Sequence, residues 1–189
     1  MASSTHTRNL KGSHGVLIDM DTAALLEFRR EKDEFFSSSH QSPLDHADQR
    51  NFAGLDYFDP NPDLVFSLAM EPADGSEISV QTSDGQERVY RRSGKVKFEV
   101  GEEAVTLTLY STEHPGFFVP FRDSTSGKDT YGAGRYLDID PTDNGKVTID
   151  FNLAYNPYCV YNDGYSCPLP PAENWLQVPI AAGELDYTR

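Results

Sequence analysis

The stretch KVKFEVGEEAVTLTLY, residues 95–110, decides the fold class because its apolar side chains alternate with polar ones. Val96 and Phe98 stand two positions apart, and Val105 and Leu107 continue the same period after the turn residues GEE. A period of two places alternate side chains on opposite faces of a strand, and a short polar turn joins antiparallel neighbours. The stretch therefore predicts a β-hairpin with one apolar face.

Similar runs follow the chain from residue 64 onward, with turn sequences such as PADG, TSDG, RRSGK and PTDNG between them. The runs lie at residues 64–70, 78–80, 89, 96–100, 105–109, 117–121, 135–139, 147–151 and 176–180. They predict about nine short strands joined by tight connections. Because exposed strand edges must be paired or covered, we expect a mainly β fold, an antiparallel meander that forms a barrel or a curled two-sheet roll.

One N-terminal α-helix is expected before the strands. Leu25, Phe28 and Phe36 recur at helical spacing, and Asp21 precedes them as a capping candidate. We therefore expect a helix over residues 22–36 that covers one end or one side of the sheets. The Ser-, Pro- and Asp-rich residues 37–63 are expected to form an ordered crossing loop.

The net charge of the chain restricts its partners. There are 30 Asp and Glu against 16 Lys and Arg, which gives a net charge of −14. Such a charge repels phosphate backbones and anionic lipid surfaces, so we expect neither nucleic acid nor a membrane as a partner. The acidic excess favours a halophilic protein, although an ordinary acidic domain can have the same composition. Melting in low and in molar salt distinguishes these two cases.

The first sixteen residues differ from the rest in composition. They are polar, rich in Ser and Gly, and lack the apolar stretch of a secretory signal. We therefore expect residues 1–16 to be a disordered leader and residues 17–189 to form a single β-rich domain of a cytoplasmic protein.

An arginine occupies an apolar position in the strand predicted from AGRYLDI. In this run Arg135 shares a face with Leu137 and Ile139. A buried guanidinium requires a carboxylate, backbone carbonyls or a bound anion, because an unpaired buried charge costs several kcal/mol. The alternative to a bound anion is a structural ion pair with Asp138 or Asp150, which would hold strand ends together.

The loop DSTSGKDTYGAG, residues 123–134, lies between two arginines. From Arg122 to Arg135, with Lys128 in the loop, there are three cations and two anions in a chain that is otherwise acidic. Glycine-rich backbone can turn N–H groups toward a ligand, and guanidinium groups can hold a carboxylate or phosphate with two hydrogen bonds. The loop matches neither a Walker P-loop nor a dinucleotide fingerprint, so the expected ligand is a small anion of unspecified class.

Tyrosines concentrate in the same half of the chain, and residues 151–175 are too rich in Asn, Pro and Tyr for a solvated loop. We expect this segment to fold over the sheets as a rigid lid that packs on them, the alternative being a lid that also lines a pocket. The most favoured function is a domain that binds a small anionic or carboxylate-bearing molecule in a polar Arg- and Tyr-lined pocket of a β-barrel. The expected ligand-binding residues are Arg122, Lys128, Tyr131, Arg135, Tyr136, Asn152, Tyr155, Asn156 and Tyr158.

An enzyme that uses the same pocket is the alternative function. Asp123 or Asp150 would act as the base and Tyr131 as the acid, and Cys159 is the candidate nucleophile. Cys159 and Cys167 are the only cysteines of the chain. The sequence leaves three states open for them: two free thiols, a disulfide, or one reactive thiolate. Their spacing does not suit zinc, so neither a metal nor a cofactor is expected.

Two long segments carry a resemblance to a known family. They are FFVPFRDSTSGKDTYGAGRYLDID, residues 117–140, and IDFNLAYNPYCVYNDGYSCPLPPAENWLQVPIAAGE, residues 149–184. The chain resembles, over residues 20–185, an uncharacterised family of bacterial and haloarchaeal proteins, domain of unknown function 1684 (DUF1684). The resemblance implies no activity, substrate or cofactor.

Overall fold

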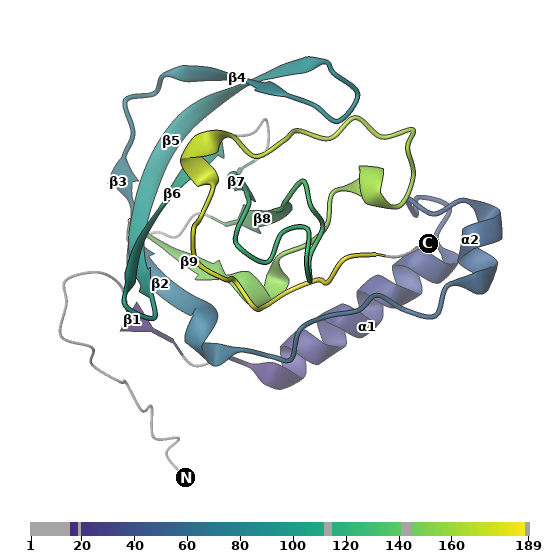
Figure 1. Cartoon of the computed structure of the whole chain (residues 1–189). Coiled ribbons are helices and arrows are strands. Elements are labelled where there is room, and N and C mark those ends of the chain that lie inside the picture. The colour runs from purple at the N-terminus through teal and green to yellow at the C-terminus, as the bar shows by residue number, and fades with distance from the viewer. Residues whose placement is uncertain (1–15, 19, 112–114, 141–144, 188–189) are drawn as a thin grey trace, which may run out of the picture.

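The computed structural model describes residues 16–18, 20–111, 115–140 and 145–187, which form two antiparallel sheets, two α-helices and a long irregular segment (Figure 1). The three-stranded sheet has the order β1-β2-β9, with β1 at Val16–Leu17, β2 at Val65–Ala69 and β9 at Lys146–Asp150. The larger sheet has the order β3-β5-β6-β7-β8, and β4 pairs with β5 off this path. Its strands are β3 (Glu71–Pro72), β4 (Glu77–Gln81), β5 (Glu87–Val100), β6 (Glu103–Ser111), β7 (Phe117–Phe121) and β8 (Arg135–Ile139).

The mainly β prediction is confirmed, in the form of a curled two-sheet roll. In the described part of the chain the strand order of each sheet stays open, so the sheets do not close into the barrel that was the other expectation. The β5–β6 hairpin predicted from residues 95–110 has the expected register, with Val96 opposite Leu107 and Phe98 opposite Val105. These four side chains are buried in the main core between the two sheets.

The sequence RRSGK was expected to be a turn, and this was wrong. The chain instead continues as one strand, β5, with a register shift between Arg92 and Gly94. A β-carbon on Gly94 would lie 2.5 Å from the Met70 side chain, so this glycine allows a close approach that a larger residue would block. The bulge gives β5 the length to pair with β3 and β4 along one edge, and a bulge also bends a strand.

The run 176–180 was expected to be a strand, but it has no strand geometry. Its apolar side chains Leu176, Val178 and Ile180 do alternate into the core. The backbone around it makes an isolated parallel bridge between Trp175 and Arg122, and the Leu176 N–H donates to the Arg122 carbonyl at 2.7 Å. Pro179 has no N–H, so a regular ladder cannot continue through this run.

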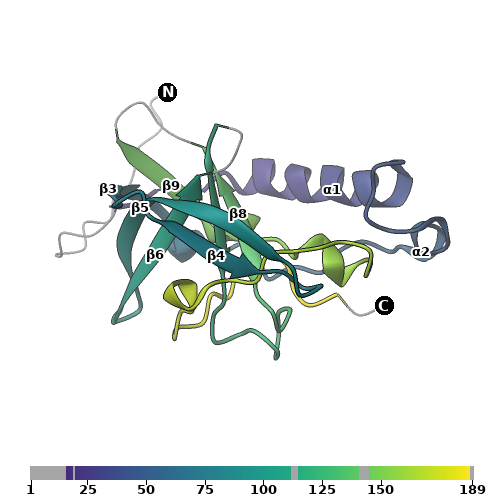
Figure 2. The ribbon, with the colours of Figure 1, turned by 90° about the horizontal axis from the view of Figure 1, so that it is seen from above.

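The predicted helix is confirmed as α1, Thr22–Ser38, with the Asp21 carboxylate accepting from the Ala24 N–H at 3.0 Å. It lies along one side of the sheets and projects beyond them (Figure 2). A second helix, α2 (His46–Asn51), lies in a region expected to be a loop. Four short 3₁₀ helices are η1 (Pro62–Leu64), η2 (Phe151–Leu153), η3 (Tyr158–Val160) and η4 (Ala172–Asn174). Among the described residues, no helix is both long enough and apolar enough to cross a membrane.

The expected leader, residues 1–16, lies outside the described residues except for Val16, which begins β1. The segment after β9 runs between β5 and α1 in Figure 1. It returns to the helix end of the molecule, where an isolated bridge pairs Tyr57 with Glu184. This arrangement brings α1, β5 and the C-terminal segment around one region of the molecule.

Candidate functional site

Arg135 is fully buried and its guanidinium is held by the protein itself. Its Nη2 donates to Asp123 Oδ2 at 3.0 Å and to the Ile180 carbonyl at 2.8 Å. Its Nη1 donates to the carbonyls of Ala182 and Glu184. Burial lowers the pKa of Arg135, while the Asp123 carboxylate opposes that change. Arg135 lines neither of the two cavities described below, so the expected anion between Arg122 and Arg135 is replaced by the protein's own acceptors.

The structural ion pair of Arg135 therefore exists, but its carboxylate is that of Asp123 in the loop 123–134. The expected partners, Asp138 and Asp150, make other contacts. Asp138 is exposed and accepts the Tyr155 hydroxyl at 2.7 Å. Asp150 caps η2 by accepting the Asn152 N–H at 2.9 Å. The alternation that placed Arg135 inward was correct, whereas the choice of Asp138 or Asp150 as its partner was wrong.

The loop 123–134 uses its polar groups internally. Asp123 Oδ1 accepts from the Thr125 N–H at 2.8 Å and from the Thr125 hydroxyl at 2.6 Å. The N–H groups of residues 128–130 all donate to the Thr125 carbonyl. Gly134 has φ +107°, and a β-carbon there would lie 2.5 Å from the Phe121 carbonyl oxygen. The glycines and hydroxyls of this loop therefore build a compact turn, in which the backbone N–H groups of residues 123–130 all donate within the protein.

A small cavity of about 290 Å³ lies beside this loop. Arg122 and Lys128 both line it, together with Ser126 and Trp175. The Arg122 guanidinium lies over the Trp175 ring, 5.4 Å from the ring centre. Two of the three expected cations thus meet at the surface, while Arg135 is buried on the other side of the strand.

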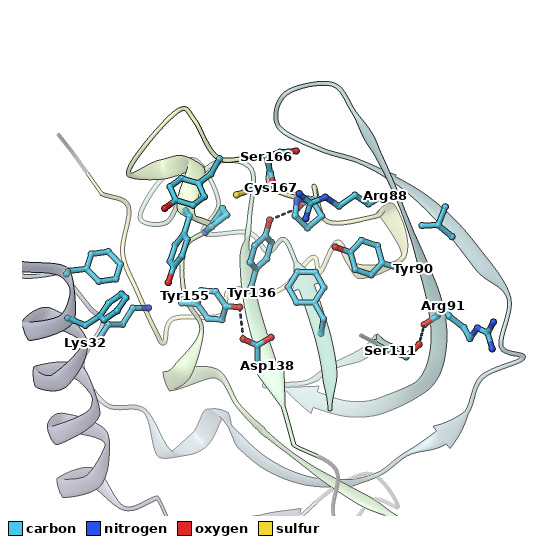
Figure 3. Close-up of a pocket in the computed structure, with 18 of the residues that line it drawn as sticks. Lys32, Arg88, Tyr90, Arg91, Ser111, Tyr136, Asp138, Tyr155, Ser166 and Cys167 are labelled. Carbon is cyan, nitrogen blue, oxygen red and sulfur yellow. Dashed lines mark hydrogen bonds between the residues drawn. The ribbon is translucent and has the colours of Figure 1, made fainter. Parts of the chain in front are cut away.

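A much larger cavity, of about 1370 Å³, opens between α1, β5 and the C-terminal segment (Figure 3). Its walls are mainly apolar and aromatic. Lys32 projects from α1 on one side, Arg88 and Tyr90 project from β5 on the other, and Tyr136 and Tyr155 lie between them. Exposed apolar side chains also line the cavity. Val89 on β5 is 65% exposed, and Phe28 on the facing helix α1 is 45% exposed.

The aromatic side chains of the cavity pack edge to face. The ring centres of Phe118 and Tyr136 are 4.8 Å apart, and those of Tyr136 and Tyr155 are 5.7 Å apart. The Tyr136 hydroxyl donates to the Pro168 carbonyl at 2.6 Å. Tyr158 and Tyr165 form a further edge-to-face pair at 5.3 Å. Tyr136 and Tyr155 are held both by ring contacts and by hydrogen bonds of their hydroxyls, so this part of the wall is ordered without a ligand.

The tyrosines of this wall are weak acids. Burial raises the pKa of Tyr136, of Tyr155 and of Tyr158 above the ordinary value of 10. In Tyr155 the neighbouring Asp138 carboxylate raises the pKa further. The hydroxyls therefore stay protonated at neutral pH and act as hydrogen-bond donors.

The three cations of the cavity differ in what already neutralises them. Lys32 forms an ion pair with the buried Glu184 at 2.5 Å, and Arg91 forms one with Glu77 at 3.7 Å. Arg88 is in no ion pair with any described residue, although its Nη2 donates to the Ser166 carbonyl at 2.9 Å. Arg88 is therefore the cavity cation whose charge is left for a ligand.

The expected ligand-binding residues are divided between several places. Tyr136, Tyr155 and Tyr158 line the large cavity. Asn152 and Asn156 do not, because their side chains bond to the backbone at Asn61 and Leu185. Tyr131 lies against Cys159, outside the residues that line the cavity.

The residues that sequence reasoning missed are Lys32, Arg88 and the aromatic face of α1 around Phe35. Arg88 and Tyr90 alternate on a run that was recognised as a strand, so a signal was present in the sequence. One chain alone does not show which element covers that face. In the described ranges, no group of three or more His, Cys, Asp or Glu is placed to hold a metal ion, and both cysteines are free thiols.

Comparisons with known proteins agree with this reading of the fold. The solution NMR structure of an uncharacterized protein from Haloarcula marismortui matches with a TM-score of 0.66 and 38% sequence identity, covering 86% of this chain and 92% of that one. No protein of curated function matches. A family model described as "Protein of unknown function (DUF1684)" matches residues 50–185. Since that match spans well over half of the sequence, the chain belongs to the DUF1684 family.

Proposed function

We propose that this protein binds a small molecule that combines a flat apolar or aromatic body with a carboxylate or similar anionic group, in the large cavity between α1 and β5. The observation that carries the proposal is the guanidinium of Arg88, which has no carboxylate partner among the described residues and borders a preformed aromatic wall. Of the three described cations that line this cavity, Lys32 pairs with Glu184 and Arg91 with Glu77, whereas Arg88 has no such partner.

The apolar part of the ligand follows from the walls. Tyr136, Tyr155 and Phe118 present ring faces and edges to the cavity, and flat molecules gain dispersion and edge-to-face contacts there. The volume of about 1370 Å³ exceeds the 300–1,000 Å³ of an ordinary ligand pocket. A ligand of ordinary size would therefore occupy only part of the cavity, which favours the end where Arg88 and Tyr90 stand.

The anionic part follows from Arg88. A guanidinium is always charged and offers two parallel N–H groups to a carboxylate. One Nη atom already donates to the Ser166 carbonyl, which fixes the orientation of the group. Arg88 itself is exposed, so solvent screens its charge, and its attraction for an anion becomes stronger when the apolar body of the ligand displaces water from the guanidinium.

The acid–base enzyme that was the alternative function has less support. Asp123 holds Arg135 and Thr125, Asp150 caps η2, and neither lines the cavity. The tyrosines that line it have raised pKa values, so they lack an acid suited to neutral pH. A binding domain requires none of these groups to titrate.

The experiment compares 1-naphthoate with 1-naphthamide, which differ only in the charged group, by isothermal titration calorimetry and thermal unfolding. We expect the carboxylate to bind at least about tenfold more tightly, the effect of one charge-assisted hydrogen bond. At a concentration 100 times its Kd it should stabilise the fold by about 2.7 kcal/mol. The variant Arg88→Gln should remove the preference for the carboxylate.

The matched control is Arg122→Gln, the same substitution in the small cavity beside Trp175. It should leave the naphthoate affinity unchanged. Equal binding of acid and amide by the unaltered protein, or a loss of binding in Arg122→Gln and not in Arg88→Gln, would contradict the proposal. The second result would move the anion site to the loop 123–134.

A further inference from the structure

The two cysteines of the chain lie in contact at the edge of the large cavity. Cys159 belongs to η3 and is half-buried, whereas Cys167 is buried and lines the cavity. The Cys159 N–H donates to Cys167 Sγ at 3.3 Å, and the two thiol groups also form a hydrogen bond with each other. Eight positions separate them in the sequence, so the intervening loop folds back to bring the sulfurs together.

Hydroxyl groups from two other segments complete the surroundings of Cys159. The hydroxyls of Ser83 and Tyr131 lie near its sulfur. Ser83 is held in place because its N–H donates to the Cys167 carbonyl at 2.8 Å, and its hydroxyl accepts the Cys167 N–H at 3.1 Å and donates to the Tyr165 carbonyl at 3.2 Å. The sulfur of Cys159 thus has polar neighbours, of which the Cys167 thiol and the Tyr131 hydroxyl can donate to a thiolate.

These contacts act differently on the two thiols. A hydrogen bond with the Cys167 thiol is the largest cause that lowers the pKa of Cys159, to about 6, although burial opposes it. The contact with the Cys159 thiol and burial raise the pKa of Cys167, while the Cys159 N–H acts in the opposite direction. These directions favour Cys159 as the thiolate of the pair and Cys167 as its hydrogen-bond donor.

We propose that Cys159 and Cys167 form a redox modification site in which hydrogen peroxide converts the two thiols to a disulfide. The Cys159 sulfur attacks one peroxide oxygen, the O–O bond breaks, and the departing hydroxide takes a proton to become water. This leaves Cys159 as a sulfenic acid. The Cys167 sulfur then loses its proton and attacks the Cys159 sulfur, the S–O bond breaks, and a second water leaves.

The step is balanced, because two thiols and one peroxide give one disulfide and two waters. The peroxide gains the two electrons that the two sulfurs lose. The sulfurs must move from hydrogen-bond contact to a bond of about 2.05 Å, which the loop between them can absorb. A dithiol reductant reverses the reaction by thiol–disulfide exchange.

The disulfide would act on the cavity because the loop 160–166 carries part of its wall. Tyr165 and Ser166 line the cavity, and Ser166 supplies the carbonyl that orients Arg88. Closing a covalent loop around these residues restricts their motion. The site does not depend on the proposed ligand, so its test is separate from that of the binding function.

The test treats the reduced protein at pH 7 with a small excess of hydrogen peroxide and follows intact mass and thiol alkylation after unfolding. Because the chain has only two cysteines, every alkylated thiol is one of this pair. We expect the mass to fall by two hydrogen atoms, both thiols to become protected, and dithiothreitol to reverse both changes. In Cys167→Ser, dimedone should trap the sulfenic acid on Cys159.

The control variant is Cys159→Ser, in which Cys167 should react with peroxide far more slowly than Cys159 does in Cys167→Ser. Melting curves and circular dichroism check that both variants fold. Peptide mapping of iodoacetamide alkylation in the unaltered protein gives a measurement that needs no variant. There, modification of Cys159 should rise with a midpoint near pH 6 and precede that of Cys167.

The groups that face the pair during this titration are Tyr90, Tyr131, Tyr136 and the cation Arg88. Burial raises the pKa of each of the three tyrosines above its ordinary value of 10, so none of the three titrates near pH 6. A midpoint near pH 9 for both cysteines, or thiols that remain free after peroxide treatment, would overturn the proposal. So would equal peroxide reactivity of the two single variants.

Discussion

Two arginines of this protein, Arg135 and Arg88, have opposite roles. Arg135 follows the glycine-rich loop, lies on the apolar face of β8 and is fully buried, and its Nη groups bond to Asp123 and to backbone carbonyls. Arg88 lies near the start of β5, is exposed and has no carboxylate partner among the described residues. A cation in an apolar sequence pattern therefore indicated a structural pair, whereas Arg88, the cation without a carboxylate partner at the large cavity, was not singled out by its local sequence.

A third arginine, Arg92, is intermediate between these two and pairs with Glu173 at 2.9 Å. This pair joins β5 to η4 and is only partly buried, with side-chain exposures of 20% and 29%. The free-energy cost of removing the guanidinium from water decreases from Arg135 through Arg92 to Arg88. The need for a carboxylate partner to offset that cost decreases in the same order. The three arginines thus form a series in which the effect of a substitution should follow burial.

The largest effect is expected for Arg135→Met. The substitution leaves the Asp123 carboxylate buried without its cation, and breaking a buried pair in this way costs about 3–5 kcal/mol. We expect that loss in the free energy of unfolding, measured by urea titration at pH 7. The affinity for 1-naphthoate, measured where the variant is folded, should not change.

The double variant Arg135→Met with Asp123→Asn provides the control. Asparagine removes the buried charge while its side-chain oxygen can still accept from Thr125. The double variant should therefore be more stable than Arg135→Met alone. If both variants lost less than about 1 kcal/mol, the buried pair would behave like a surface pair and the contrast between Arg135 and Arg88 would disappear.

A smaller effect is expected for Glu184→Gln, which concerns the wall opposite Arg88. The Glu184 carboxylate pairs with Lys32 on α1 and accepts from the Asn156 N–H and the Tyr161 hydroxyl. A hydrogen bond to a charged group contributes about 1.5–3 kcal/mol, and glutamine retains part of these bonds without the charge. We expect a loss of about 1.5–3 kcal/mol in the free energy of unfolding, again by urea titration.

The control for this variant is Glu31→Gln, one residue before Lys32 on α1 and exposed at the cavity. An exposed substitution without a buried partner should change stability by less than about 0.5 kcal/mol. Equal losses in the two variants would mean that Glu184 does not anchor α1 through its charge.

The sequence was sufficient to predict the parts of the fold in which local pattern and burial agree. The β5–β6 hairpin and α1 each have a period that matches their structure over many residues. The same alternation placed Arg135 correctly on the inner face of β8. It could not show that Gly94 marks a bulge and not a turn, because the reason is the side chain of Met70, which is distant in the sequence.

The candidate site was predicted only in part for the same reason. Tyr136, Tyr155 and Tyr158 were expected at a pocket and do line one. The cavity itself depends on the distance and orientation of α1 relative to β5. The hydrophobic period within either element does not specify that arrangement. Arg88 and Lys32 become a pair of facing cations only through this tertiary arrangement, so a reading of local motifs favoured the loop 123–134 instead.

The smallest effect is expected for Arg92→Gln, and its pH dependence tests the middle of the series. Burial alone would raise the pKa of Glu173, but hydrogen bonds from Arg92 and Tyr110 outweigh it and hold that pKa below its ordinary value of 4.5. A carboxylate whose pKa is lowered by folding stabilises the fold above its unfolded pKa, and this contribution is lost as the pH falls through the folded pKa. At pH 7 we expect Arg92→Gln to lose about 0.2–1 kcal/mol, because the pair is partly exposed and screened by solvent.

The same variant should approach the stability of the unaltered protein as the pH falls below about 4.5, since Glu173 then becomes protonated in both proteins. Urea titrations of the two proteins at several pH values between 7 and the onset of acid unfolding measure this convergence. Arg91→Gln, at the exposed pair with Glu77, is the neighbouring control and should show little difference at any pH. A difference for Arg92→Gln that persisted unchanged into acid would mean that Arg92 acts through packing or through its bond to Ser76, and that its charge has no part in the series.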